Sequence, residues 1–129
     1  MSCLLFWAYA TPAPGDTIYY NVSKHGAKGD GKTDDLPALT KLFEKASKQK
    51  LPAKVVFAPG KVYRIGQHLG DLYGRILISR ASNLVVEGNG CTLMIHPSSR
   101  AFALYRSQNI IVRNFKIDYS PLPYTQGRV

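Results

Sequence analysis

The chain of 129 residues is long enough for one domain of modest size with a single hydrophobic core. Its hydrophobic content of 45% and aromatic content of 11% exclude an intrinsically disordered chain. A formal net charge of +9 favours polyanionic partners, namely nucleic acid, acidic lipid or acidic polysaccharide, without choosing among them. Because the basic residues are dispersed along the chain, a well-solvated surface also accounts for this charge.

The first residues, MSCLLFWAYATPAPGD, show the features of a truncated export leader. An apolar run from Cys3 to Ala10 ends in Ala8-Tyr9-Ala10, which fits a signal-peptidase cleavage site, although the usual basic residues before the run are missing. We therefore expect residues 1–13 to be a signal-peptide-like leader and the protein to be secreted or periplasmic. The run is too short to span a bilayer, so we expect no membrane span. The alternative is that residues 4–7 form a first strand.

Removal of the leader would leave Cys91 as the only cysteine, so no intramolecular disulfide would be available. Small secreted domains usually need disulfides, because their cores are small. A secreted chain without them must be stabilised by a more extensive core than this chain holds. The cysteine content therefore predicts a fragment of a longer protein.

The first half of the mature chain predicts a strand, a turn and a helix. Residues 17–22 combine β-branched and aromatic side chains, as strands do, and the glycine-rich stretch after them is typical of a turn. Thr33 or Asp34 suits a helix N-cap, and Pro37 falls in the first helical turn, where its missing N–H is not needed. VVFAPGKVYRI then predicts two short strands around its Pro-Gly turn. Apolar residues keep helical spacing to about residue 50: Leu36, Leu39, Leu42, Phe43 and Ala46.

The glycine-rich stretch GAKGDGKT also satisfies the G-x-x-x-x-G-K-[ST] pattern of phosphate-binding loops. That motif requires a parallel α/β sheet and a second strand ending in an aspartate for magnesium, and the sequence shows neither. Asp34 and Asp35 would also place two negative charges beside a polyphosphate. The order of an EF-hand loop is not met from Asp30. We therefore expect no nucleotide and no metal, because the histidines also lack metal-ligand spacing: His25, His68 and His96.

A repeat with an offset of 26 residues appears when residues 75–100 are aligned with residues 101–126. Short β-branched runs at such a period predict a β-solenoid, in which equivalent side chains form ladders between coils. Asn83 and Asn109 would then occupy the same turn, where asparagine tolerates left-handed backbone and the amides hydrogen-bond along the axis. Coincidence between two apolar runs is the alternative. The aligned pairs are Arg80–Arg106, Asn83–Asn109, Leu84–Ile110, Val85–Ile111, Val86–Val112, Glu87–Arg113, Cys91–Ile117 and Thr92–Asp118.

Alternation along the second repeat divides its side chains between an inward and an outward face. The outward face carries Arg113, Lys116 and Asp118 and is the candidate surface for a ligand. Asp118 is the one residue that we expect to line a substrate groove, and Tyr124 is a candidate for contact with a sugar ring. An ordinary surface role is the alternative for each. The inward face carries Ile110, Val112, Phe115, Ile117 and Tyr119.

The stretches YNVSKHGAKGDGKTDDLPALTKLFEKA and KVVFAPGKVYRI resemble the N-terminal region of the pectate-lyase-like, right-handed parallel β-helix superfamily. The family pattern G-A-x-G-D-G-x-x-D-D-x-x-A-h is matched from Gly26 to Leu39, and V-x-F-P-x-G-x-Y is matched with Ala58 standing before the proline. The resemblance covers about residues 19–119. It implies an all-β solenoid, a right-handed parallel β-helix with an N-terminal capping α-helix, incomplete at the C-terminus. It also implies a structural cap built on Gly26, Gly29, Asp30, Gly31, Asp34 and Asp35.

The resemblance further implies a carbohydrate-active protein, because the family includes polygalacturonases and other glycoside hydrolases, polysaccharide lyases, epimerases and phage tailspikes. IDYSPLPYTQGRV also resembles a stretch of bacterial β-helix glycosidases, some of them related to α-galactosidases. The catalytic elements N-T-D, D-D, G-H-G and R-I-K of the polygalacturonase type do not occur here, and no carboxylate pair is evident. The catalytic residues are therefore unknown, with Asp118 as the sole candidate, and we expect them beyond Val129.

These observations predict one β-helix domain over residues 17–129, of which residues 17–52 form the strand, turn and cap and residues 53–129 the first coils. We expect the N-terminal fragment of a secreted glycoside hydrolase that acts on a polysaccharide or oligosaccharide, without a cofactor and without nucleic acid. Alternatives are a polysaccharide lyase of the same fold and a non-catalytic glycan-binding module of the adhesin or tailspike type.

Overall fold

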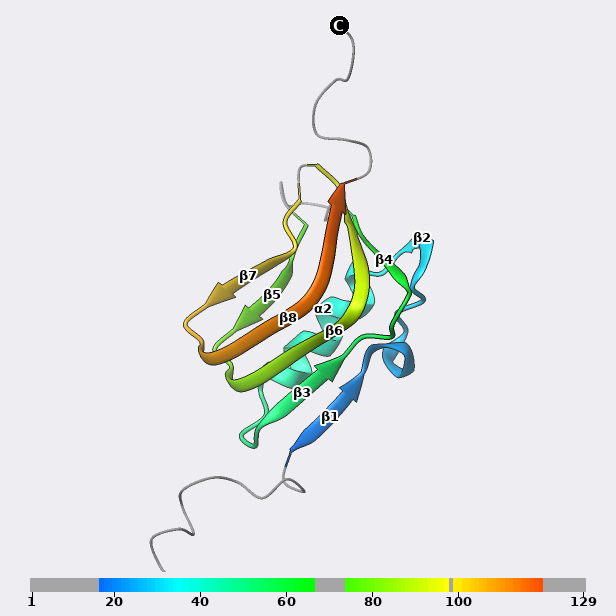
Figure 1. Cartoon of the computed structure of the whole chain (residues 1–129). Helices are drawn as coiled ribbons and strands as arrows, with labels where there is room; N and C mark the ends of the chain where they lie inside the picture. Colours follow the sequence, from blue (N-terminus) through cyan, green and yellow to red (C-terminus); the bar gives the residue numbers. More distant parts are fainter. Residues whose placement is uncertain (1–16, 67–73, 98, 120–129) are drawn as a thin grey trace, which may run out of the picture.

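The computed structural model describes residues 17–66, 74–97 and 99–119. Residues 1–13, His68 and Tyr124, on which several predictions rest, lie outside the described residues. The described elements are mostly strands, with one α-helix and one short 3₁₀ helix (Figure 1). In chain order they are β1 (Ile18–Asn21), η3 (Val22–His25), β2 (Asp30–Asp34), α2 (Leu36–Ser47), β3 (Ala53–Val56), β4 (Val62–Ile65), β5 (Ile76–Ser79), β6 (Ser82–Ile95), β7 (Phe102–Tyr105) and β8 (Gln108–Tyr119).

The strands stack in parallel as the coils of a solenoid. The long, bent strands β6 and β8 each cover two sides of a coil, and Figure 1 shows them lying against each other along their whole length. In the earlier coils the same two sides are separate strands, so that β1, β3, β6 and β8 stack on one side and β2, β4, β6 and β8 on the next. β5 and β7 form a third, separate parallel pair. All these pairings are parallel, which confirms the predicted parallel β-helix.

Helix α2 follows β2 in the first coil as β5 follows β4 in the second, and it packs chiefly against β5. Its buried side chains are the five that helical spacing predicted. The predicted boundaries need correction, because the N-cap is Asp35 rather than Thr33 or Asp34, and the helix ends at Ser47 rather than near residue 50. Asp34 still belongs to β2, although its side chain accepts a hydrogen bond from the N–H of Leu36 at 3.0 Å.

The glycine-rich stretch is more than the predicted turn, because it includes the 3₁₀ helix η3 and the strand β2. The sequence of β2, DGKTD, has little strand propensity, so the strand was not predicted. It is a strand because it pairs with β4, at two positions separated by a register shift. Gly26, Gly29 and Gly31 have φ angles of 97°, 64° and 75°, in the left-handed region that favours glycine. These φ values are compatible with glycine at the entry into the cap, where a residue with a Cβ would be strained.

Aromatic side chains from successive coils pack on one another in the core. The Phe57 ring packs edge-to-face on Tyr63, with centroids 5.1 Å apart, and on Phe115, with centroids 5.0 Å apart. Phe102 also packs on Phe115, at 5.3 Å between centroids. Phe115 is therefore inward-facing, as predicted. The other four residues predicted to face inward are each paired with a buried residue of β6. The pairs are Ile110–Leu84, Val112–Val86, Ile117–Leu93 and Tyr119–Ile95.

The predicted 26-residue offset is confirmed before the bend of β6 and β8. β5 also pairs with β7 at this offset. Asn83 and Asn109 both have φ 57°, and the Asn109 side-chain amide donates to Asn83 Oδ1 at 3.1 Å. The asparagine ladder predicted from the sequence is thus present. Beyond the bend the offset is 24, and the predicted matches of Cys91 with Ile117 and of Thr92 with Asp118 are wrong: the observed pairs are Cys91–Phe115, Thr92–Lys116 and Met94–Asp118.

The change of offset has a cause at the bend itself. Three residues of β6, Gly88 to Gly90, lie between paired positions where β8 has Asn114 alone. Gly88 permits the close approach of the two strands, because a Cβ at this position would lie 2.4 Å from the Asn114 carbonyl oxygen. The shorter bend of β8 therefore fits over the longer bend of β6 only where a side chain is missing.

Candidate functional site

The predicted ligand-binding residues lie on the outward face of β8. Arg113 precedes the bend and faces Glu87, whereas Lys116 and Asp118 follow the bend and face Thr92 and Met94. All three predicted side chains are exposed. The described part of this outward face therefore brings together one carboxylate, Asp118, and one amine, Lys116, on alternate positions of one strand.

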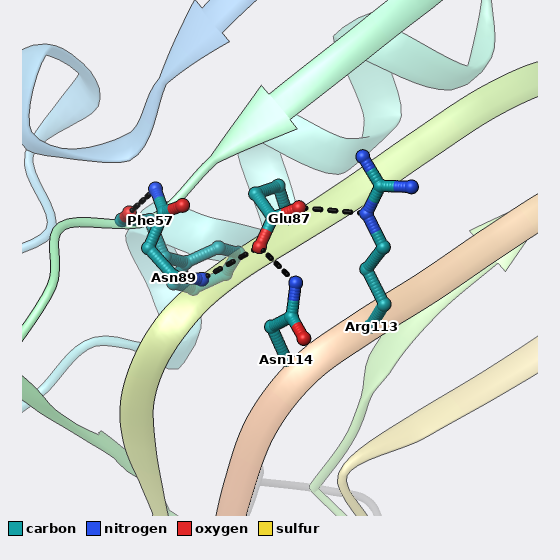
Figure 2. A network of polar contacts seen from close by, with 5 residues as sticks. All are labelled: Phe57, Glu87, Asn89, Arg113 and Asn114. Atoms are coloured by element: carbon teal, nitrogen blue, oxygen red, sulfur yellow. Dashed lines mark hydrogen bonds and ion pairs between the residues drawn. The ribbon is translucent and has the colours of Figure 1, made fainter.

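Glu87 lies at the centre of a polar network that the sequence did not predict (Figure 2). Arg113 Nε donates to Glu87 Oε1 at 2.7 Å, and the Asn114 side-chain amide donates to Oε2 at 2.8 Å. The backbone N–H of Asn89 also donates to Oε2, at 2.9 Å. The Asn89 side chain in turn donates to the Phe57 carbonyl at 2.8 Å, so the network joins three successive coils. The sequence contained one sign of this ion pair, since Glu87 and Arg113 align at the repeat offset.

The environment of Glu87 determines what its carboxylate can do. Hydrogen bonds from the Asn114 and Arg113 side chains and from the Asn89 N–H lower the pKa of Glu87 to about 2. A carboxyl group with so low a pKa is a poor general acid, and both oxygens already accept hydrogen bonds. Only 7% of the residue is exposed. Glu87 thus links coils, and Arg113, one of the predicted substrate-binding residues, is held by this ion pair.

Among the described residues, Asp118 has no carboxylate partner in its own row of the sheet at the spacing that hydrolysis requires. Its Oδ1 accepts the N–H of Tyr119 at 2.9 Å. The row runs from Asp118 through Met94 and Arg64 to Asp34, three strands away, or about 14 Å at the usual strand spacing. Inverting glycosidases place their carboxyl groups ~6.5–9.5 Å apart. Asp34 is also engaged, since its Oδ1 accepts the N–H groups of Leu36 and Gly66 at 3.0 Å each.

The aspartates of the cap occupy the backbone amides that a phosphate loop would present to its ligand. Asp35, 1% exposed, accepts the N–H of Lys28 at 2.8 Å and that of Gly29 at 3.0 Å. Asp30 accepts the N–H of Thr33 at 2.8 Å and that of Lys32 at 2.9 Å, and these bonds lower the pKa of Asp30 to about 2. Carboxylates of the same segment therefore already accept the hydrogen bonds of these loop amides. This geometry supports a structural role for the motif.

The described residues form no metal site and present no reactive thiol. No cluster of three or more His, Cys, Asp or Glu residues that could hold a metal occurs there. Cys91 is buried, and burial raises the pKa of its thiol to about 12, so it is an unreactive core residue. In the same part of the chain, no helix has the length and apolar character needed to cross a membrane.

Comparisons with known proteins agree with this architecture. Over 129 aligned positions the chain is 27% identical to alpha-1,3-galactosidase A of Streptomyces avermitilis, an alignment that covers 86% of this chain and 21% of that protein. Over 123 positions it is 28% identical to alpha-1,3-galactosidase B of Bacteroides thetaiotaomicron, covering 84% and 20%. The chain thus spans about a fifth of the length of these relatives. Residues 19–125 match the family described as rhamnogalacturonase A/epimerase, pectate lyase-like, and the chain belongs to that family.

Proposed function

We propose that the chain provides the N-terminal cap and first coils of a secreted glycoside hydrolase that acts on a glycan containing α-linked galactose. One observation carries the proposal: the parallel coils of this chain align with two curated alpha-1,3-galactosidases over more than four fifths of its length. The leader-like composition of residues 1–13 supports export. The family match supports a carbohydrate as the ligand.

In this proposal the first coils bind the glycan but do not cleave it. Lys116 and Asp118 project outward from alternate positions of β8 and can hydrogen-bond sugar hydroxyls. Glu87 is ionised and engaged, and Asp34 lies about three strand spacings from Asp118. The acid and base that hydrolysis needs would then come from further coils stacked beyond β8.

An NMR titration of the isotope-labelled chain with α-1,3-linked galactobiose tests this assignment. We expect amide shifts concentrated around Lys116 and Asp118, and no release of galactose from the same sample on prolonged incubation. Lys116→Ala with Asp118→Asn should abolish the shifts, whereas the matched pair Lys41→Ala with Glu44→Gln, on the exposed face of α2, should leave them unchanged. Equal shifts with maltose, or shifts that survive the first pair of substitutions, would contradict glycan binding at β8. Release of galactose by this chain would contradict the placement of catalysis elsewhere.

A further inference from the structure

A cleft that shares no lining residue with the outward face of β8 lies between the C-terminal end of α2 and the turn that joins β5 to β6. Its volume is about 870 Å³, within the range of ligand-binding pockets. One wall is formed by the last turns of α2 and the residues that follow it, and the other by Leu77, Ser79, Arg80 and Ser82. Figure 1 shows the β5–β6 turn and the lower end of α2 on the same side of the solenoid. We call this the α2–β5 cleft.

The lining of the α2–β5 cleft carries an excess of positive charge. Lys48, Lys50 and Arg80 line it, against one carboxylate, Glu44. Within the described ranges none of the three cations forms an ion pair, since the described salt bridge lies at Arg113 and Glu87. Lysines near the end of a helix commonly interact with its carbonyl groups, which accounts for Lys48 and Lys50. This interaction with the helix end does not account for Arg80, which lies on the opposite wall, in the β5–β6 turn.

Arg80 occupies an unusual backbone conformation that is repeated in the next coil. Its φ is 56°, and that of Arg106, at the equivalent turn, is 48°. This left-handed region is unfavourable for a residue with a long side chain, and glycine or asparagine would fit it better. The Arg80 N–H donates to the Tyr105 carbonyl at 2.8 Å, so the two turns stack directly. Two successive coils therefore direct an arginine outward from a turn that favours smaller residues, which is typical of a functional position.

The uncharged lining of the cleft matches a ligand with many hydroxyl groups. Thr40, Ser79 and Ser82 line it with hydroxyl groups that can donate hydrogen bonds to a sugar and accept them from it. Leu77, 38% exposed, adds an apolar surface on which a sugar ring can pack.

From the cation excess, the Arg80–Arg106 turn and the hydroxyl-bearing wall together, we infer that the α2–β5 cleft is a second carbohydrate site, which binds an acidic oligosaccharide. Arg80, Lys48 and Lys50 bind its carboxylate or sulfate groups, and the hydroxyl-rich wall binds the neutral part of the sugar. The site is independent of the glycan surface proposed at β8, because the two share no residue. Carboxylate and sulfate groups both present negatively charged oxygens to these cations, so the experiment uses one sugar of each kind.

Isothermal titration of the full chain tests the site with three tetrasaccharides: an oligogalacturonate, a heparin-derived sulfated sugar and neutral maltotetraose. The variant Lys48→Gln/Lys50→Gln/Arg80→Asn removes three charges from the cleft, and asparagine keeps the left-handed backbone. Lys24→Gln/Lys28→Gln/Lys61→Gln removes three exposed charges elsewhere and is the matched control. We expect binding of an acidic sugar to weaken about tenfold in the cleft variant, as for the loss of three partly exposed ion pairs, and to change little in the control.

Circular dichroism and thermal unfolding of both variants verify that the fold is kept. Binding of either acidic sugar with this pattern supports the site, and preference between them identifies carboxylate or sulfate as the recognised group. A second variant, Ser79→Ala with Ser82→Ala, should weaken binding without changing the charge. Equal losses in the cleft and control variants would show a diffuse charge effect and overturn the inference. Equal affinity for maltotetraose would overturn it as well.

Discussion

Glu87 and Arg113, which are separated by one full coil of the chain, face each other across β6 and β8 with 2.7 Å between Oε1 and Nε. The pair lies at the last position before the bend, and Asn114 completes it from the bend itself. Coils of a parallel β-helix are otherwise held by backbone ladders and apolar stacking, which do not specify where a bend must lie. The ion pair and its amide partner fix the bend of one coil on the bend of the next.

The lowered pKa of Glu87 predicts a pH dependence of stability. Its folded pKa is about 2 against an ordinary value of 4.5, so the unfolded chain binds a proton that the folded chain does not. The contribution to stability is complete above about pH 5 and is lost as the pH falls toward 2. Asp30, whose pKa is lowered from 3.8 to about 2, adds to the same loss.

Urea unfolding between pH 2 and 6 measures this contribution. In Glu87→Gln, the number of protons taken up on unfolding near pH 3 should fall by up to about one. Glu44→Gln, on the exposed face of α2, should leave the pH dependence unchanged. A wild-type free energy of unfolding that is constant from pH 5 to pH 2 would contradict the depressed values.

The asparagine ladder predicts different costs for two substitutions of Asn109. Asn109→Ala removes the 3.1 Å hydrogen bond to Asn83 and places a Cβ residue without compensation at φ 57°, so the free energy of unfolding should fall by about 1–2 kcal/mol. Asn109→Gly removes the same bond but suits the backbone and should cost about half as much. Chemical denaturation compares the two. A glycine variant as unstable as the alanine variant would indicate that the hydrogen bond, and not the backbone, sets the cost.

Gly88 predicts a steric limit at the bend. Its substitution by alanine places a Cβ 2.4 Å from the Asn114 carbonyl oxygen and 2.7 Å from the Phe115 ring, so β6 and β8 must separate locally. We expect a loss of about 1–3 kcal/mol, as for an overpacked core. Gly90→Asn is the matched control, because nothing lies within 4 Å of a Cβ there and asparagine tolerates its φ of 78°. Thermal unfolding that ranks the two variants equally would contradict the close approach.

The bend also shows how far the sequence predicts this fold. The repeat revealed the β5–β7 pairing and the asparagine ladder, because equivalent residues recur at one offset. It could not reveal the change of offset, since that depends on how tightly Asn114 packs over Gly88. Strand β2 was missed for a related reason: its hydrogen bonds come from β4, and its own residues have little strand propensity.

For the candidate site, alternation correctly placed Lys116 and Asp118 on the outward face, because register needs only period-two spacing. The engagement of Arg113 by Glu87 was not predicted, since a cross-coil ion pair depends on rotamers as well as register. The roles of the three cap aspartates were predicted only as turn and helix signals. In the structure each accepts two backbone N–H groups, and Asp35 does so while buried.

Asp35 predicts that the cap depends on one buried carboxylate. Asp35→Ala leaves the N–H groups of Lys28 and Gly29 without their acceptor, which should cost about 2–4 kcal/mol. Asp35→Asn keeps one acceptor oxygen and should cost less, and Lys32→Ala, on the exposed side of β2, should be close to neutral. Wild-type protein should show no thermal shift with magnesium and ATP, because carboxylates already bind the loop amides. A shift that depends on Lys32 would contradict this structural role.

The free edge of β8 predicts self-association of the chain. β8 pairs with β6 on one side, and no described strand pairs with its other edge. Large apolar side chains are exposed along it, with relative exposures from 37% to 48%: Ile111, Val112, Ile117 and Tyr119. An edge strand that combines unpaired backbone groups with apolar side chains is a template for another strand, whether from a further coil or from a second copy.

Sedimentation velocity over a range of concentrations measures this association. We expect the wild-type chain to form dimers and larger species, and Val112→Lys with Ile117→Lys to shift it toward monomer, because lysines on an edge strand oppose strand addition. Leu51→Lys, which introduces a charge at a residue 46% exposed but outside β8, should leave the distribution unchanged. A wild-type chain that stays monomeric at high concentration, or an equal effect of Leu51→Lys, would contradict the edge as the contact. Since the substituted positions stack on the buried Val86 and Leu93, recovery of the monomer with unchanged circular dichroism would also show that the coils beneath β8 fold without a further coil above them.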